Sequence, residues 1–177
     1  VVVAAAEREG FAAAARAAPA DLAARFACDR VSIGHRRGRR TVVRAISHAA
    51  QFGRRMNLVH LLAATMDEAV DQRAVVLHPE DQAAEPLATR AAAALARAHG
   101  AGHVLTVPLY AVDRYVGAVT FERPEHRPFT QAEIETLEAA VTVLAPVLEE
   151  KRANDRWLIT RAGDTVAAHL GRLLGPG

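Results

Sequence analysis

The chain has 177 residues, of which 51% are hydrophobic and 24% charged, a balance typical of one folded domain. A single cysteine excludes an internal disulfide, and no uncharged stretch is long and apolar enough to indicate a membrane-spanning helix. The net charge is only +2, but it is unevenly distributed. Residues 30 to 66 hold eight arginines and no acid, whereas residues 131 to 150 hold five glutamates and no base, so we expect one basic and one acidic surface.

The first half of the chain is expected to form helix, hairpin and helix. Alanine dominates residues 4 to 27, which favours a helix that Pro19 is expected to divide. β-type residues at 31 to 33 and 41 to 46 flank a polar segment, and this pattern predicts a hairpin. Asn57 is expected to cap the next helix, whose apolar residues keep helical spacing.

The second half begins with a predicted short strand at 74 to 77 and an alanine-rich helix at 85 to 99. A second hairpin is predicted from residues 104 to 110 and 115 to 122, in which Gly117 indicates a bulge or a close approach of another backbone. Since hairpins build antiparallel sheets, this order predicts an α+β fold. We expect a central antiparallel sheet of five to six strands, helices on both faces and an added C-terminal helix.

The helix after the second hairpin starts with a predicted capping box, Thr130 with Glu133. Pro146 is expected to bend it, and a separate helix is expected over residues 154 to 174. In the helix that starts at this capping box, the apolar residues alternate steps of three and four, a spacing that defines a heptad seam. The seam residues are Ile134, Leu137, Val141, Leu144 and Leu148. The seam either packs on the sheet or pairs with a second copy in a parallel dimer.

A small set of side chains borders the irregular segment after the first hairpin or alternates with apolar residues on the late strands. Small-molecule sites combine a few polar groups with a largely apolar cavity, so we interpret this set as a candidate ligand-binding pocket. The candidate residues are Ser47, His48, Asn57, Met66, Asp67, Thr106, Tyr110 and Thr120. The alternative is that they are ordinary caps and surface positions.

Other chemistry is weakly indicated. Cys28 is expected to be a buried apolar residue, and the histidine spacings do not predict a metal site. No nucleophile elbow, phosphate-binding loop or dinucleotide fingerprint occurs. The arginine run from Arg36 to Arg40 is either a solvated hairpin tip or a grip for phosphates, a protein or anionic lipid. It lacks interleaved aromatic residues, so no nucleic-acid partner is expected.

The late hairpin and the segment after it resemble the C-terminal half of a GAF domain. The resemblance rests on VPL at 107 to 109, VGAVTF at 116 to 121, RPFT at 127 to 130 and the helix that follows. CDRVSI at 28 to 33 is similar to the opening of that fold, which is itself PAS- and profilin-like. The resemblance implies a small-molecule or regulatory module that dimerises through terminal helices.

The chain departs from several GAF subclasses. It lacks the extra cysteines of the GAF-type methionine sulfoxide reductases, and Cys28 lies too early for bilin attachment. Residues typical of cyclic-nucleotide binding are not matched, so no cofactor is named and the ligand stays open. Residues 155 to 158 and 173 to 177 resemble the segment that joins a cytoplasmic GAF region to a transmembrane helix in bacterial HlyD-type membrane-fusion adaptors.

We therefore expect an N-terminal helical segment at 1–29, a GAF domain at 30–150 and an amphipathic connector helix at 151–177. The expected function is a non-catalytic sensor that binds a small molecule or partner, forms a homodimer and signals through its terminal helices. The expected location is the cytoplasm, tethered to the inner membrane, with the membrane surface or a transporter as candidate partners of the last helix. The alternatives are a ligand-free assembly module and a GAF-type reductase.

Overall fold

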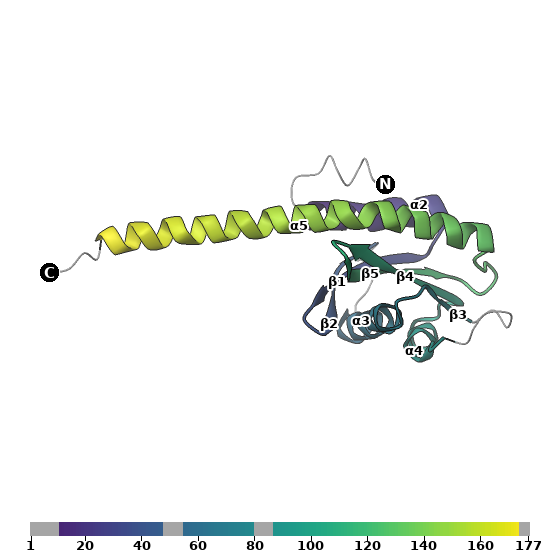
Figure 1. The fold of residues 1–177 in the computed structure, drawn as a ribbon. Coiled ribbons are helices and arrows are strands. Elements are labelled where there is room, and N and C mark those ends of the chain that lie inside the picture. The colour runs from purple at the N-terminus through teal and green to yellow at the C-terminus, as the bar shows by residue number, and fades with distance from the viewer. Residues whose placement is uncertain (1–10, 48–54, 80–86, 174–177) are drawn as a thin grey trace.

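The computed structural model describes residues 11–47, 55–79 and 87–173, with side chains for 17–47, 56–79 and 87–154. Within these ranges, five strands form one antiparallel sheet in the order β2-β1-β5-β4-β3. The four helices described there lie on its two faces (Figure 1). The expected α+β fold, with a five-stranded antiparallel sheet and a C-terminal helix, is confirmed.

The sheet is built from two hairpins that pair through its centre. β1 (Arg30–Arg37) and β2 (Arg40–Ile46) form the first hairpin, and β4 (His103–Ala111) and β5 (Arg114–Arg123) form the second. β1 pairs with β5, and the short β3 (Val76–His78) adds to the outer edge of β4. The β4–β5 turn therefore joins two central strands, whereas the β1–β2 turn joins a central strand to an edge strand.

The first hairpin is longer than predicted, because β1 continues through Gly34 instead of ending before it. A Cβ on Gly34 would lie 2.3 Å from the Met66 Sδ, so only glycine lets α3 pack this closely on the sheet. A Cβ on Gly117 would lie 2.1 Å from the Gly34 carbonyl oxygen. The close backbone approach predicted at Gly117 is therefore confirmed.

Two helical layers enclose the sheet. α2 (Phe11–Phe26) and α5 (Gln131–Leu173) cover one face, and α3 (Arg55–Gln72) and α4 (Arg90–His99) cover the other (Figure 1). The larger core cluster lies on the α2–α5 face. Its members include four of the predicted seam residues, Leu137, Val141, Leu144 and Leu148. The seam therefore packs within the chain itself.

Several helix boundaries differ from the predictions, and α4, for example, begins at Arg90 instead of residue 85. α2 runs unbroken through Pro19, and α5 runs unbroken through Pro146, so the expected division and the separate helix at 154 to 174 are wrong. Each proline removes one backbone donor, and packing of the flanking apolar residues on the sheet outweighs that loss. α3 begins at Arg55, so Asn57 is exposed inside the first turn and is not the cap.

The start of α5 is confirmed as a capping box. Glu133 donates its backbone N–H to the Thr130 hydroxyl, and its carboxylate accepts from the Thr130 N–H at 2.9 Å. From there the helix continues for 43 residues, about 65 Å at 1.5 Å per residue, and extends well past the sheet (Figure 1). Among the described residues, no helix combines the length and apolarity needed to cross a membrane.

Candidate functional site

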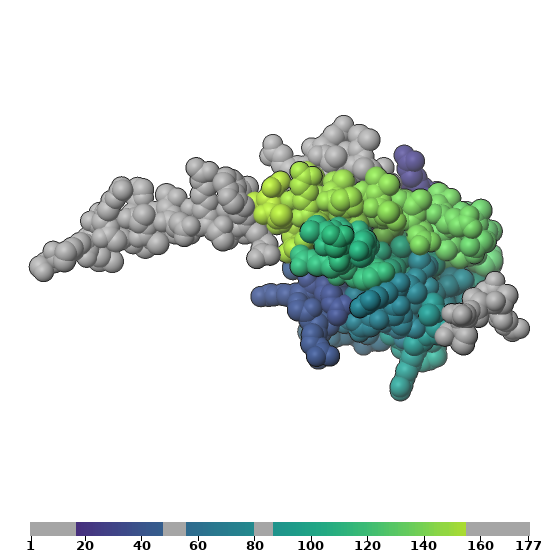
Figure 2. Space-filling model, viewed as in Figure 1, coloured from purple at the N-terminus to yellow at the C-terminus, as the bar shows by residue number. Residues whose placement is uncertain are grey.

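Two adjoining hollows of about 610 and 480 Å³ lie at the end of the sheet where α5 leaves the domain. They share Arg36, Arg114 and Tyr115, and we call the pair the hairpin groove. In the space-filling view, the β4–β5 turn projects beside α5, above the β1–β2 hairpin (Figure 2). The groove is therefore bordered by both hairpins and by the terminal helix.

The groove collects side chains from four separate segments. Arg36 comes from β1, Arg73 follows α3, Arg114 opens β5 and Arg152 lies on α5. The remaining lining residues are His35, Arg37, Gly38, Val70, Asp71, Tyr110, Asp113, Tyr115 and Val116. Five arginines face two aspartates, so the groove is strongly basic.

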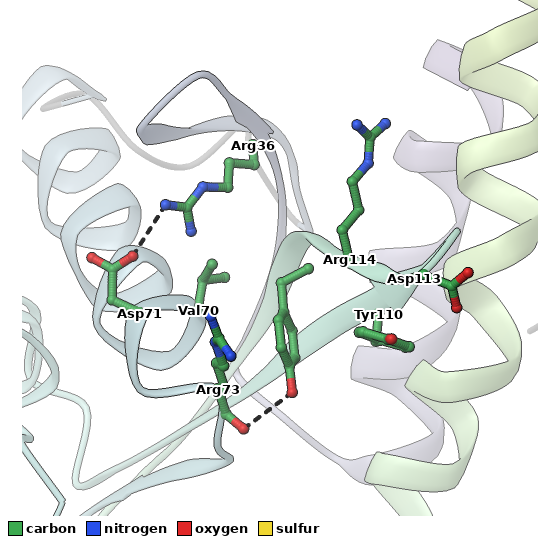
Figure 3. Close-up of a pocket in the computed structure, with 8 residues that line it drawn as sticks. Arg36, Val70, Asp71, Arg73, Tyr110, Asp113 and Arg114 are labelled. Carbon is green, nitrogen blue, oxygen red and sulfur yellow. Dashed lines mark hydrogen bonds and ion pairs between the residues drawn. The ribbon is translucent and has the colours of Figure 1, made fainter.

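A few contacts shape the larger hollow (Figure 3). Arg36 donates to the Asp71 carboxylate at 3.2 Å, and the Tyr115 hydroxyl donates to the Arg73 carbonyl at 3.3 Å. The rings of Tyr110 and Tyr115 meet edge to face with centroids 5.1 Å apart. This arrangement holds one aromatic pair beside the arginines.

Glu149 links the groove to α5. Its side chain is 7% exposed and accepts from Arg114 Nη2 at 3.3 Å, and Arg152 on the next helical turn donates to it at 2.8 Å from Nε and again from Nη2. The hydrogen bonds from Arg152 hold the pKa of Glu149 below its ordinary value. Glu149 is thus a buried anion shared between the β4–β5 turn and the terminal helix.

His35 lies beneath this cluster, with its Nδ1 4.0 Å from Glu149 Oε2. Burial, reinforced by the charge of Arg152, lowers the pKa of His35 to about 4. The attraction of Glu149 acts in the opposite direction but does not outweigh them. At neutral pH the ring is therefore uncharged, and its contact with Glu149 is not an ion pair.

Of the predicted ligand-binding residues that fall within the described ranges, only Tyr110 lines the hairpin groove. Ser47 is buried, and its Oγ accepts from the Val31 N–H at 2.9 Å, which anchors β1. Asp67 accepts from the Thr41 N–H at 2.7 Å and so holds β2 on α3. Met66 is fully buried, and Asn57 is exposed at the start of α3. His48 lies outside the described residues.

Thr106 and Thr120 lie on the α3–α4 side of the sheet, where their hydroxyl oxygens pair at 3.2 Å. A second buried polar pair lies along the same face. Arg30 donates to Glu122 at 2.6 Å from Nε and again from Nη2, and both side chains are under 10% exposed. Burial raises the pKa of Glu122, and the contacts with Arg30 oppose that rise. These groups satisfy one another and form a polar layer within the core.

Nucleophilic and metal chemistry find little support in the described part of the chain. Cys28 is 7% exposed, and burial raises the pKa of its thiol, which disfavours the reactive thiolate. No group of three or more His, Cys, Asp or Glu residues within the described ranges is placed to hold a metal ion.

Most of the groove was not predicted from the sequence. The arginine run drew attention to Arg36 and Arg37, either as a solvated hairpin tip or as a grip for phosphates, a protein or anionic lipid. Arg73, Arg114 and Arg152 are isolated basic residues with no local pattern, because each contributes from a different element. The usable signals were the arginine run, which contains Arg36 and Arg37, and the strand alternation that selected Tyr110.

The described residues form a small α+β domain with a ligand-sized groove beside a long terminal helix. The chain belongs to the GAF domain family, since the model of that family matches residues 12–148. GAF domains are commonly sensor or regulatory domains. No curated protein is significantly similar to the chain.

Solved structures with this fold come from several kinds of protein. One is the phycoerythrobilin-bound GAF domain of a cyanobacterial phytochrome (TM-score 0.63, 18% identity, 86% of this chain and 92% of that chain). Another is the GAF domain of an Acinetobacter phosphoenolpyruvate-protein phosphotransferase (0.62, 14%, 86% and 90%). A third is the free methionine-R-sulfoxide reductase of Neisseria meningitidis, in complex with its substrate (0.62, 16%, 86% and 86%). At these identities the likeness defines the fold alone.

Proposed function

We propose that the chain is a non-catalytic regulatory domain that binds a small molecule in the hairpin groove and passes the bound state to α5. The observation that carries this proposal is the position of Glu149. This buried carboxylate on α5 accepts from Arg114 of the groove and from Arg152 of its own helix. A ligand that moves Arg114 therefore changes a contact that holds the output helix to the sheet.

The test combines thermal stability with hydrogen exchange. We expect one class among cyclic nucleotides, amino acids, aromatic acids and haem to raise the melting temperature by mass action. The same ligand should change amide exchange in α5 after residue 149, and Glu149→Gln should remove that change although the ligand still binds, with an affinity no lower than for the native chain. A ligand that binds outside the groove, or that leaves exchange in α5 unaltered, would contradict the proposal.

Two further features are proposed for the whole protein. The resemblance of residues 155 to 158 and 173 to 177 supports attachment to an HlyD-type adaptor in the cytoplasm at the inner membrane, with residues 151–177 as the connector. The continuation of α5 to Leu173 supports such a connector. We also propose a homodimer, which would use outward faces of the terminal helices, because the predicted seam residues are occupied within the chain.

A ligand-free assembly module is the second candidate. It is favoured by Met66, which is fully buried against Gly34 and Ala118 and fills the space beside the predicted polar residues. The open groove around Tyr110 favours the sensor instead. A reductase is the least supported, and equal inactivity of the native chain and Cys28→Ser towards free methionine sulfoxide would remove it.

A further inference from the structure

We propose that the hairpin groove binds a small organic oxyanion, a phosphate or a carboxylate, and that Arg114 exchanges its contact with Glu149 for one with this ligand. The inference rests on the proposed function and adds to it the chemical class of the ligand and the residue that switches. It is carried by four observations: the charge of the groove, its aromatic pair, its backbone conformation and the geometry around Glu149.

The first observation is an excess of available cations. The side chains of Arg37 and Arg73 make no hydrogen bond or ion pair within the described ranges. Arg36 is bound to Asp71, but that carboxylate is 64% exposed, and exposed pairs of this kind contribute little free energy. Guanidinium groups bind phosphate and carboxylate oxygens through paired donors, so the groove is suited to an oxyanion.

The second observation points to an organic anion. Tyr110 is 50% exposed, a high value for a large aromatic side chain, and its ring contacts Tyr115 edge to face. The Tyr115 hydroxyl is held by the Arg73 carbonyl, which fixes the orientation of that ring. An accessible and oriented aromatic surface next to arginines suits the planar or apolar part of a ligand whose charged group contacts the guanidinium groups.

The third observation is backbone strain at the lining residues. Arg73 and Asp113 both adopt positive φ, at 56° each, although neither is glycine. Such conformations are unfavourable for L-residues and cluster at binding sites, where they aim the backbone and side chains. Arg73 lies in the turn after α3, and Asp113 shares the β4–β5 turn with Val112, whose φ is also positive at 53°; both turns border the larger hollow.

The fourth observation explains why Arg114 is the residue that exchanges. Its side chain is 63% exposed, and its contact with Glu149 is 3.3 Å long. Arg152 donates to the same carboxylate twice, at 2.8 Å from Nε and again from Nη2. Glu149 therefore keeps a charged partner when Arg114 leaves, so the exchange strands no buried charge. In Figure 3, the Arg114 side chain extends from the hairpin away from Tyr110 and Asp113, and its high exposure leaves it accessible to a ligand.

The experiment is isothermal titration calorimetry with phenyl phosphate, benzoate and the uncharged benzyl alcohol. We expect phenyl phosphate, benzoate or both to bind, more weakly at high salt, and benzyl alcohol not to bind. The tighter of the two anions identifies the charged group. Arg114→Gln should weaken binding by about tenfold or more, since a hydrogen bond to a charged group is lost. Glu149→Gln should tighten it, because a competitor for Arg114 loses its charge.

Arg97→Gln is the matched control, since it removes the same charge from an exposed position on α4, outside the groove. Equal weakening by Arg97→Gln and Arg114→Gln would overturn the site. Weaker or unchanged binding in Glu149→Gln, with native circular dichroism, would overturn the exchange. If only neutral compounds bind, the oxyanion class is wrong while the proposed function stands. A last measurement is co-sedimentation with phosphatidylserine vesicles. If the native chain binds the vesicles, Arg114→Gln does not, and neither phenyl phosphate nor benzoate binds, then the partner is a lipid surface and the small-molecule ligand is wrong.

Discussion

Two buried titratable residues define the chemistry at the base of the groove. Glu149 stays charged because Arg152 and Arg114 donate to it, while His35 stays neutral because burial and the charge of Arg152 disfavour its protonation. As the pH falls, keeping Glu149 charged and keeping His35 neutral both become unfavourable. The folded chain then has to protonate a group whose environment resists it, or unfold.

The residue-scale prediction concerns pH. The pKa of His35 falls from its ordinary 6.5 to about 4, so between these values the unfolded chain binds a proton that the folded chain does not. Stability therefore decreases as the pH falls through this window, and the loss saturates below about 4. Between pH 7 and pH 5 we expect the native chain to lose about 2 kcal/mol more than His35→Gln, at ~1.4 kcal/mol per pKa unit. Urea unfolding across this range measures the difference.

The lowered pKa of His99 also reduces stability as the pH falls. This contribution is the same in the native chain and in His35→Gln, so it cancels when the two are compared. The depressed pKa of Glu149 adds a loss at lower pH, because its stabilisation disappears as the carboxylate protonates. Parallel stability curves for the native chain and His35→Gln would mean that His35 titrates normally.

At the scale of elements, the start of α5 has two functions. The Thr130 hydroxyl caps the helix, while Glu133 completes the capping box and also binds Arg123, whose side chain is 1% exposed. The Arg123 guanidinium in turn lies 4.3 Å from the centre of the Phe129 ring. One carboxylate thus ends the loop, starts the helix and neutralises a buried cation.

Two substitutions separate these functions. Glutamine still completes a capping box, so Glu133→Gln removes mainly the charge beside Arg123, and we expect a loss of about 2 kcal/mol, since Glu133 is itself partly exposed. Thr130→Ala should cost about 1 kcal/mol through the lost cap. Glu135→Gln, on the exposed side of the same turn, should change stability by less than about 0.5 kcal/mol. Urea unfolding ranks the three, and the reverse order would show that the cap matters more than the ion pair.

At the scale of the whole molecule, α5 has a part that belongs to the core and a part that extends beyond it. Its first part places the seam against the sheet, with Leu144 fully buried, and its second part extends beyond the domain (Figure 1). Under the proposed function, a helix without a break between these parts would transmit a shift at Glu149 towards its C-terminal end. In this proposal the groove and the extended part of α5 therefore act as one mechanical unit.

Leu144→Ala tests the role of the seam. Removing a buried leucine from the core should lower the free energy of unfolding by about 3 kcal/mol. Because the side chain is buried within one chain, the loss should not depend on protein concentration. Val143→Ala, on the outward side at 54% exposure, should have little effect on the stability of one chain. A Leu144→Ala loss that shrinks on dilution, as the native dimer itself dissociates, would place the seam at a dimer interface.

Local sequence patterns determined the sheet, the two hairpins, the capping box and the apolar face of α5, because alternation, turn residues and caps act within a few positions. They failed at Pro19 and Pro146, where packing on the sheet outweighs a local break, and at Asn57, where α3 starts earlier. The pattern of the seam was correct, but only the fold decided that it packs inside the chain.

The hairpin groove was decided by tertiary structure. Arg36, Arg73, Arg114 and Arg152 are far apart in the chain and follow no common spacing, so their convergence depends on strand register and on where α3 and α5 end. The same holds for Glu149, an ordinary acidic helix residue in the sequence that burial turns into a shared anion. Local periodicity specifies which face of an element is buried. Which charged side chains come together depends on how all the elements are positioned relative to one another, and this is set only by the tertiary structure.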